Sequence, residues 1–313
     1  MPFLGNGGRI ARLLKPRNDW CLSAFSSRRH LVSCWMAGRA RRLTPAWKSS
    51  GESRTASVAP AMALIHSIYR YPVKGLSPEA LPRIALAPGE TVPGDRLYAI
   101  ENGPSGFDPS APAYLSKQHF LMLMKNERLA ALRTAFDQAS HVLRIQDGES
   151  EAARGDLRTD KGRAGIENFF ATSFADELLG APKILHADGH SFSDVASKVV
   201  SIINLTSVAA LEDIVDATVN PLRFRGNVYV TGWPAWSELD LVGKEVSIGA
   251  HARFKVVKRI VRCASTNVDP LTGIRDLNIP KALMRALGHS DCGIYAEVTA
   301  AGEIAAGNEI EIV

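Results

Sequence analysis

Short apolar segments separated by turn residues constrain the fold of this 313-residue chain more than any other feature of its sequence. After residue 62, most of these segments are rich in β-branched and aromatic residues, which is typical of strands. Turn residues such as Pro93-Gly94 and Asn102-Gly103-Pro104 separate them. Helices do not alternate regularly with the strands, so a doubly wound parallel sheet is disfavoured. The pattern predicts a mostly β fold with a few helices.

The individual elements follow from the spacing of apolar residues. Strands are expected over residues 64–71, 81–87, 96–101, 183–186, 199–203, 227–231, 245–248, 253–261, 293–298 and 309–313. Helical spacing predicts helices over residues 125–137, 165–179, 207–215 and 281–287. The charged stretch 148–165 lacks periodicity and is interpreted as a surface loop or a pair of edge strands. Gly180-Ala181-Pro182 divides the chain into two predicted domains, residues 62–180 and 181–313.

The basic residues are concentrated at the N-terminus. Residues 1–61 contain 11 of the 37 Lys and Arg but only Asp19 and Glu52, and the remaining chain has a net charge of −4. The body therefore gives no electrostatic reason to expect nucleic acid as a partner. Gly and Pro recur throughout residues 1–61, which indicates a disordered leader, a misplaced start or, in a eukaryote, a mitochondrial transit peptide. Without such a peptide, a cytoplasmic location is expected.

Hydropathy and cysteine spacing exclude several classes of protein. No run approaches the roughly 18 apolar residues of a membrane span, so no span is expected. The four cysteines form no CxxC pair and have no zinc-like spacing with the histidines. Only Cys263 and Cys292 lie in the body, which is too few for an iron–sulfur cluster held by one chain. Neither a disulfide framework nor a structural zinc site is expected.

Cys263 lies where a β-branched strand ends and a polar turn begins, in Arg262-Cys263-Ala264-Ser265-Thr266-Asn267. The thiolate is the reactive and metal-binding form of cysteine, and the neighbouring Arg262 would favour it. The position therefore suits a nucleophile or a soft metal ligand. A lone cysteine at a strand end is, however, more often a small core residue. The residues alone leave both interpretations open.

Three cations and an amide lie at predicted strand edges. Lys74 follows a strand in Tyr71-Pro72-Val73-Lys74-Gly75, and Arg96 has a similar position in Gly94-Asp95-Arg96. Arg225 and Asn227 alternate with apolar residues, so both are expected on one face of their strand. Together they could hold a phosphate, since guanidinium binds such oxygens bidentately and lysine acts as a point charge. Each cation alone is more commonly a solvated surface charge.

The segment Asn204-Leu205-Thr206-Ser207 joins a predicted strand to a predicted helix. Thr206 or Ser207 is expected to cap this helix. A helix N-terminus is also a binding site for anions. The Asn-Leu-Thr triplet matches a glycosylation sequon, which we discount because no signal peptide is recognised.

Taken together, these motifs resemble the MOSC family in order and spacing. The resemblance runs from about residue 63 to residue 313 and implies a MOSC N-terminal β-barrel domain followed by a MOSC domain. The family includes mitochondrial amidoxime-reducing components and bacterial hydroxylaminopurine-resistance reductases. It implies that Cys263 is the catalytic residue and a ligand to molybdenum in a pterin cofactor. The residues expected to bind this molybdenum cofactor are Lys74, Arg96, Arg225, Asn227 and Arg262, with help from Asn204, Thr206 and Ser207.

The resemblance implies a molybdenum-dependent oxidoreductase that reduces small N-hydroxylated or N-oxide substrates. Its electrons would come from a separate donor protein of the ferredoxin, flavodoxin or cytochrome type. Two positions depart from amidoxime-reducing members: Val261 and Gly75 stand where those proteins have serine. The alternative is a sulfur-carrier or cofactor-handling protein that uses a persulfide on Cys263. Relatives of that type carry a pyridoxal-phosphate desulfurase-like domain, for which no segment of suitable size is found.

Overall fold

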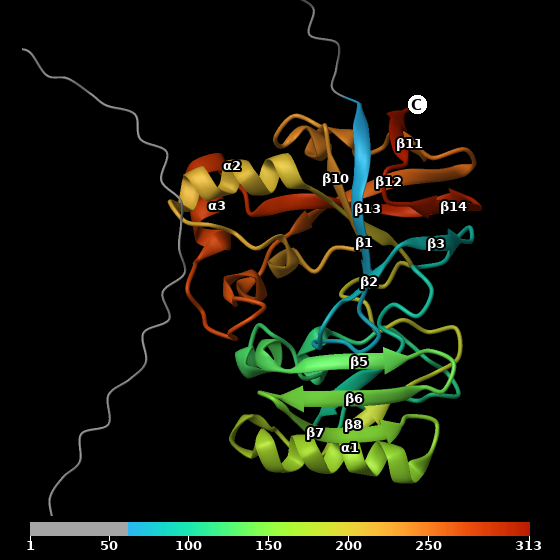
Figure 1. The fold of residues 1–313 in the computed structure, drawn as a ribbon, viewed down its shortest axis with the longest axis vertical. Helices are drawn as coiled ribbons and strands as arrows, with labels where there is room; N and C mark the ends of the chain where they lie inside the picture. The colour runs from blue at the N-terminus through green and yellow to red at the C-terminus, as the bar shows by residue number, and fades with distance from the viewer. Residues whose placement is uncertain (1–61) are drawn as a thin grey trace, which may run out of the picture. The chain divides into compact units, whose positions relative to one another are not determined.

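The computed structural model describes residues 62–313 (Figure 1). Its strands are β1 (Ala63–Arg70), β2 (Glu79–Leu81), β3 (Arg83–Leu86), β4 (Ala99–Asn102), β5 (Arg133–Asp137), β6 (Val142–Asp147), β7 (Ser150–Asp156), β8 (Pro182–Leu185), β9 (Val200–Asn204), β10 (Val228–Thr231), β11 (Glu245–Ile248), β12 (Ala252–Val261), β13 (Asp291–Ala300), β14 (Gly302–Ala305) and β15 (Glu309–Ile312). Its α-helices are α1 (Asp160–Ser173), α2 (Leu205–Val215) and α3 (Ile279–Leu287). The predicted mostly β fold is confirmed. The interpretation of residues 1–61 as a leader lies outside the described residues.

Seven strands close into a barrel. Their order is β10-β9-β13-β12-β11-β15-β1, and β1 pairs back onto β10, while β2 extends the sheet at β1. All neighbours in the ring are antiparallel except β9 and β10. Closure pairs the edges of the sheet and so removes exposed backbone donors and acceptors. The first described strand, β1, therefore completes a barrel whose other six strands all lie after residue 199.

Alternate side chains of the barrel strands form one hydrophobic core. In β12, for example, Phe254 and Val256 are buried while their neighbours are partly exposed. They pack with residues such as Ile65, Ile202 and Ile294 from other strands. This follows from the two-residue period of a strand, which points successive side chains to opposite faces. Burying each such side chain stabilises the fold by about 1.5–3 kcal/mol.

A second core lies between the three-stranded sheet β5-β6-β7, the pair β4-β8 and helix α1, which packs against β7 and β8. Thr159 caps α1 by accepting a hydrogen bond from the backbone N–H of Gly162. Gly155 in β7 lies so close to this first turn that an added Cβ would be 2.2 Å from the carbonyl oxygen of Gly162. Only glycine allows β7 and α1 to approach each other this closely.

One of the predicted element assignments is wrong, and a second is right only in part. Residues 125–137 form a 3₁₀ turn, η2 (Glu127–Ala131), followed by strand β5, instead of one helix. Leu132 and Phe136 are four residues apart, a spacing that fits one face of a helix and also one face of a strand. Pairing of Phe136 with Leu143 in β6 decides in favour of the strand. The stretch 148–165 contains the edge strand β7 and the start of α1, so the helix begins at Asp160.

Helices α2 and α3 pack against each other and, through a third core, against the barrel (Figure 1). Leu211 of α2 and Leu283 of α3 are fully buried there beside Tyr229 and Cys292. Among residues 62–313, no helix combines the length and the hydropathy needed to cross a bilayer.

Candidate functional site

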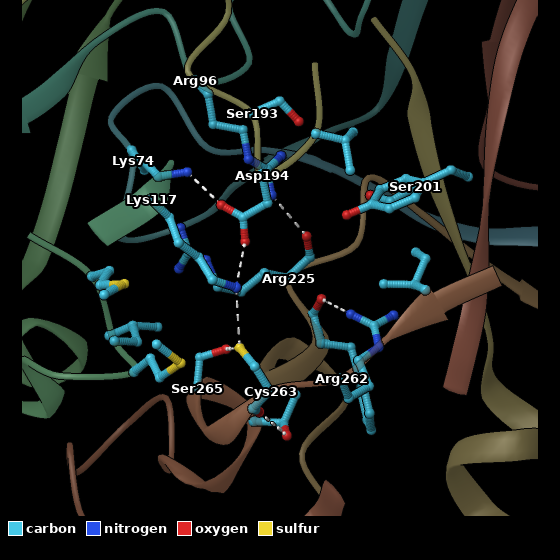
Figure 2. Close-up of a pocket in the computed structure, with 18 of the residues that line it drawn as sticks. Lys74, Arg96, Lys117, Ser193, Asp194, Ser201, Arg225, Arg262, Cys263 and Ser265 are labelled. Atoms are coloured by element: carbon cyan, nitrogen blue, oxygen red, sulfur yellow. Dashed lines mark hydrogen bonds and ion pairs between the residues drawn. The ribbon is translucent and has the colours of Figure 1, made fainter. Parts of the chain in front are cut away.

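A cavity of about 220 Å³ opens where several strand ends and loops meet. Its wall contains six of the residues singled out in the sequence, namely Lys74, Arg96, Arg225, Asn227, Arg262 and Cys263. They come from the segment after β1, the turn before β4, the link between η4 (Pro221–Phe224) and β10, and the end of β12. Figure 2 shows most of these side chains around one space. The fold therefore brings together motifs that lie up to about 190 residues apart in the chain.

Cys263 follows β12 and is the residue before the 3₁₀ turn η6 (Ala264–Asn267). Its Sγ lies 3.0 Å from Oγ of Ser265 and accepts a hydrogen bond from Nζ of Lys117 at 3.4 Å. Burial opposes ionisation, but hydrogen bonds from Ser265 and the charge of Lys117 outweigh it and hold the pKa of the thiol below its usual range. The site therefore favours the thiolate, the form that attacks electrophiles and binds metals.

A chain of ion pairs leads from the thiol into the pocket. Asp194 contacts Lys74 and lies 3.5 Å from Lys117, so one carboxylate lies between two ammonium groups (Figure 2). Although burial opposes this, the charges of Lys74 and Lys117 lower the pKa of Asp194 strongly. Lys74 is almost fully buried and also donates to the carbonyl oxygen of Phe192 at 2.9 Å. The side chain of Asp194 nevertheless stays 47% exposed, because the pocket is open to solvent.

Two arginines pack on the same buried aromatic ring. The guanidinium carbons of Arg96 and Arg225 lie 4.8 and 4.2 Å from the ring centroid of Tyr71. Arg96 also donates to the backbone carbonyl of Arg225 at 3.1 Å. Both arginines have a φ of 50°, a left-handed conformation that is costly for residues other than glycine and is often found at functional sites. The contacts with the Tyr71 ring and the hydrogen bond between the two residues hold these cations near each other, in an arrangement suited to a phosphorylated or otherwise anionic ligand.

The expectation that Arg225 and Asn227 share a strand face is wrong. Arg225 ends the turn η4 in a left-handed conformation, and Asn227 precedes β10. The Oδ1 of Asn227 accepts hydrogen bonds from the backbone N–H and hydroxyl of Ser201, and its Nδ2 donates to the carbonyl of Tyr69. Its amide is thus engaged in joining β9 to β1 at the pocket wall.

Arg262 does not contact the thiol that it precedes. Its guanidinium donates to the carbonyl oxygens of Cys292 and Phe224 and lies over the Phe224 ring. The expectation that Arg262 biases the thiolate is therefore corrected: the cation beside Cys263 is Lys117. Arg262 instead ties the end of β12 to neighbouring segments.

Asn204, Thr206 and Ser207 do not line the pocket. Asn204, and not Thr206 or Ser207, caps α2 by accepting a hydrogen bond from the backbone N–H of Thr206. Its Nδ2 and the hydroxyl of Ser207 both donate to Oε2 of the buried Glu238. This cluster therefore holds α2 to the segment after β10, away from the residues around Cys263.

Sequence reasoning missed Lys117 and Asp194. Lys117 begins the short turn η1 (Lys117–His119), and Asp194 lies in the irregular segment between β8 and β9. Neither occurs in a pattern that indicates a site, and 146 residues separate Lys117 from Cys263. Among the described residues, no group of three or more His, Cys, Asp and Glu side chains could hold a metal ion by itself.

Comparison with known structures gives a few weak similarities, including the following two. One is the crystal structure of the YuaD protein from Bacillus subtilis, with 14% identity over 80% of this chain and 95% of that chain and a TM-score of 0.39. The other is YiiM from Geobacillus stearothermophilus, with 21% identity over 36% of this chain and 53% of that chain and a TM-score of 0.29. A search of curated proteins gives no match. Neither structure is similar enough to transfer a property to this chain.

Family matches are more informative. Residues 62–176 match the MOSC N-terminal beta barrel domain, and residues 185–311 match the MOSC domain. Together the matches cover most of the described residues and confirm the resemblance noted in the sequence motifs. MOSC domains occur in proteins that bind the molybdenum cofactor, some of which are enzymes. The chain therefore belongs to the MOSC family.

Proposed function

We propose that this protein binds the molybdenum cofactor in the pocket around Cys263 and reduces N-hydroxylated or N-oxide substrates. The observation that carries the proposal is one thiol, biased towards thiolate, in the same pocket as the cations Lys74, Arg96, Lys117 and Arg225. The cofactor is an anionic pterin with a phosphate and a metal that accepts soft sulfur ligands. A cationic pocket with a single thiolate fits both halves of such a group.

The residues divide into two roles under this proposal. Arg96 and Arg225, already held together by Tyr71, would bind the phosphate and pterin oxygens, with Lys74 as a third positive charge. Cys263 would ligate the metal, and the hydrogen bond from Ser265 and the charge of Lys117 would keep its sulfur deprotonated. Asn227 would support the pocket wall through its hydrogen bonds with Ser201 and Tyr69. In this role its amide would not need to contact the cofactor.

When bound, the cofactor would supply the two-electron chemistry that removes an oxygen atom from the substrate nitrogen. The N–O bond breaks, and two electrons and two protons give the reduced nitrogen compound and water. The electrons would come from a separate donor protein. Lys117 remains protonated, because the charges of Asp194 and Cys263 outweigh its burial and raise its pKa. It would therefore keep a positive charge beside the sulfur during turnover.

The experiment is to purify the full chain from a host that makes the cofactor and to measure molybdenum and pterin per chain. Wild type should contain both and should reduce benzamidoxime with a chemical electron donor, whereas Cys263→Ala should lose molybdenum and activity. Cys292→Ala is the matched control, because burial raises the pKa of that thiol to about 12 and it does not line the pocket. Wild type without molybdenum, or equal loss in both variants, would contradict the proposal.

A sulfur-carrier function is the second candidate, because a partly exposed thiol with a lowered pKa is also suited to hold a persulfide. In that case, the metal-free protein should carry an added sulfur atom on the peptide containing Cys263. Mass spectrometry of wild type and Cys263→Ala distinguishes the two functions, since only the reductase requires bound pterin and metal.

A further inference from the structure

The pocket around Cys263 has an apolar part as well as a cationic one. Three consecutive residues, Met122, Leu123 and Met124, line it, and so does Val261 two residues before Cys263. Met122 and Leu123 are almost fully buried, whereas Met124 is only partly buried. Val261 is 69% exposed, so an apolar side chain faces water at the pocket.

The segment Met122-Leu123-Met124, called the methionine segment below, is held in place although it has no regular secondary structure. Asn126 accepts a hydrogen bond from the backbone N–H of Met122 at 3.1 Å. Arg275 donates to the carbonyl oxygens of Leu123 and Met124 at 3.0 and 2.8 Å. The same guanidinium donates to the carbonyl oxygen of Ala264, the residue after Cys263, at 3.0 Å. One rigid, planar group thus connects the backbone of the methionine segment to the turn that carries the thiol.

We propose that Met122, Met124 and Val261 form an apolar wall that selects substrates with an aromatic or other bulky apolar body. The identity of the reacting N-hydroxylated group rests on the proposed function, whereas the wall is a property of the pocket itself. Methionine side chains are flexible and polarisable and make favourable contacts with aromatic rings. A polar body placed against them would lose hydrogen bonds to water without replacing them.

The charge distribution in the pocket leads to the same assignment. The proposed function assigns Lys74, Arg96 and Arg225 to the cofactor. Within the protein, Lys74 pairs with Asp194, Arg96 pairs with Asp95, and Arg225 stacks on the Tyr71 ring. These positive charges suit the charged cofactor. The apolar wall then remains free to contact the uncharged part of a substrate. An apolar body that covers Val261 also removes its exposed surface from water, which favours binding.

The wall can be tested in the metal-free full chain, with Cys263 as the reporter. N-benzylmaleimide and N-methylmaleimide carry the same reactive ring but differ in apolar size. Mass spectrometry of the Cys263 peptide gives the ratio of their rate constants, and glutathione gives the same ratio without a wall. In wild type the benzyl-to-methyl ratio should exceed that of glutathione by about tenfold. Met124→Gln, which keeps the length of the side chain, should lower it towards the glutathione value.

Met284→Gln is the matched control, because Met284 is exposed on α3 and does not line the pocket. It should leave the ratio at the wild-type value. The proposal is overturned if wild type shows the same ratio as glutathione, or if both glutamine variants change it equally. Val261→Ser provides a second variant at an exposed position and should also lower the ratio.

A second measurement uses the molybdenum-loaded protein and compares kcat/KM for benzamidoxime and acetamidoxime. Met124→Gln should lower the benzamidoxime-to-acetamidoxime ratio about tenfold at equal molybdenum content. A protein without molybdenum or activity that still shows the maleimide preference would refute the proposed reductase but support the wall. An active reductase with no maleimide preference would refute the wall and keep the reductase.

Discussion

Replacing Lys117 by methionine should weaken the thiolate of Cys263 in the metal-free protein. Nζ of Lys117 lies 3.4 Å from Sγ, and its side chain is 29% exposed at the edge of a hydrated pocket. With the dielectric constant of water, two unit charges at this distance attract each other by about 1 kcal/mol. Losing that attraction should lower the ratio of thiolate to thiol at a fixed pH about fivefold.

The assay is the rate of alkylation of Cys263 by iodoacetamide between pH 5 and 10, measured on its own peptide. Because a more basic thiolate is intrinsically more nucleophilic, the rate near pH 7 should fall only about two- to threefold. The midpoint of the pH profile should move to higher pH. Lys258→Met is the matched control, since Lys258 lines the same pocket but makes no hydrogen bond to the thiol. An unchanged midpoint in Lys117→Met, or an equal shift in both variants, would refute the reasoning.

Three further predictions concern charge and backbone geometry. Burial, opposed by its hydrogen bonds, raises the pKa of Glu238 above its ordinary value of 4.5, so the folded state holds this proton more tightly than the unfolded state. The contribution of this proton to the free energy of unfolding is complete below pH 4.5 and is lost as the pH rises through the folded pKa. The melting temperature of Glu238→Gln should therefore rise relative to that of wild type as the pH rises above 4.5. A difference in melting temperature that stays constant with pH would contradict this prediction. Gly75→Ala should lower the free energy of unfolding, measured with urea, by about 1 kcal/mol more than Gly307→Ala does. Both glycines have a φ near 85°, but only at Gly75 would the new Cβ meet a backbone oxygen, at 3.0 Å. Asp194→Asn removes the negative charge between two lysines, so inorganic phosphate should bind about fivefold more tightly by calorimetry; weaker binding would show that Asp194 supports the anion site.

The types of most elements could be predicted from local sequence. Alternation of apolar residues predicted β12 to within one residue and the central residues of β13, because one face of each strand is buried in the barrel. The helix predicted over residues 125–137 is wrong, because the spacing of Leu132 and Phe136 fits both a helix and a strand. There the neighbouring strand β6 determined the outcome, since pairing of backbone groups is not visible in a local pattern.

The candidate site divides in the same way. Cys263 at the end of a strand, and Lys74, Arg96 and Arg225 as possible anion-binding groups, were identified from short motifs. Lys117, Asp194 and the anchoring role of Arg275 belong to no motif. Their contacts with Cys263, Lys74 and the methionine segment join residues more than 100 positions apart.

By itself, the sequence determined a mostly β fold, the positions of most of its strands and the MOSC family, because periodicity and short motifs depend on neighbouring residues. Only the tertiary structure decided which cation stands beside Cys263. Arg262 is its neighbour in the chain, yet its guanidinium is bound to the carbonyls of Phe224 and Cys292, whereas Lys117 reaches the thiol from a distant turn. In an extended segment, successive side chains point in opposite directions, so adjacency in sequence does not bring two functional groups into contact. Packing of the segment between β4 and β5 against the turn after β12 brings Lys117 to the thiol.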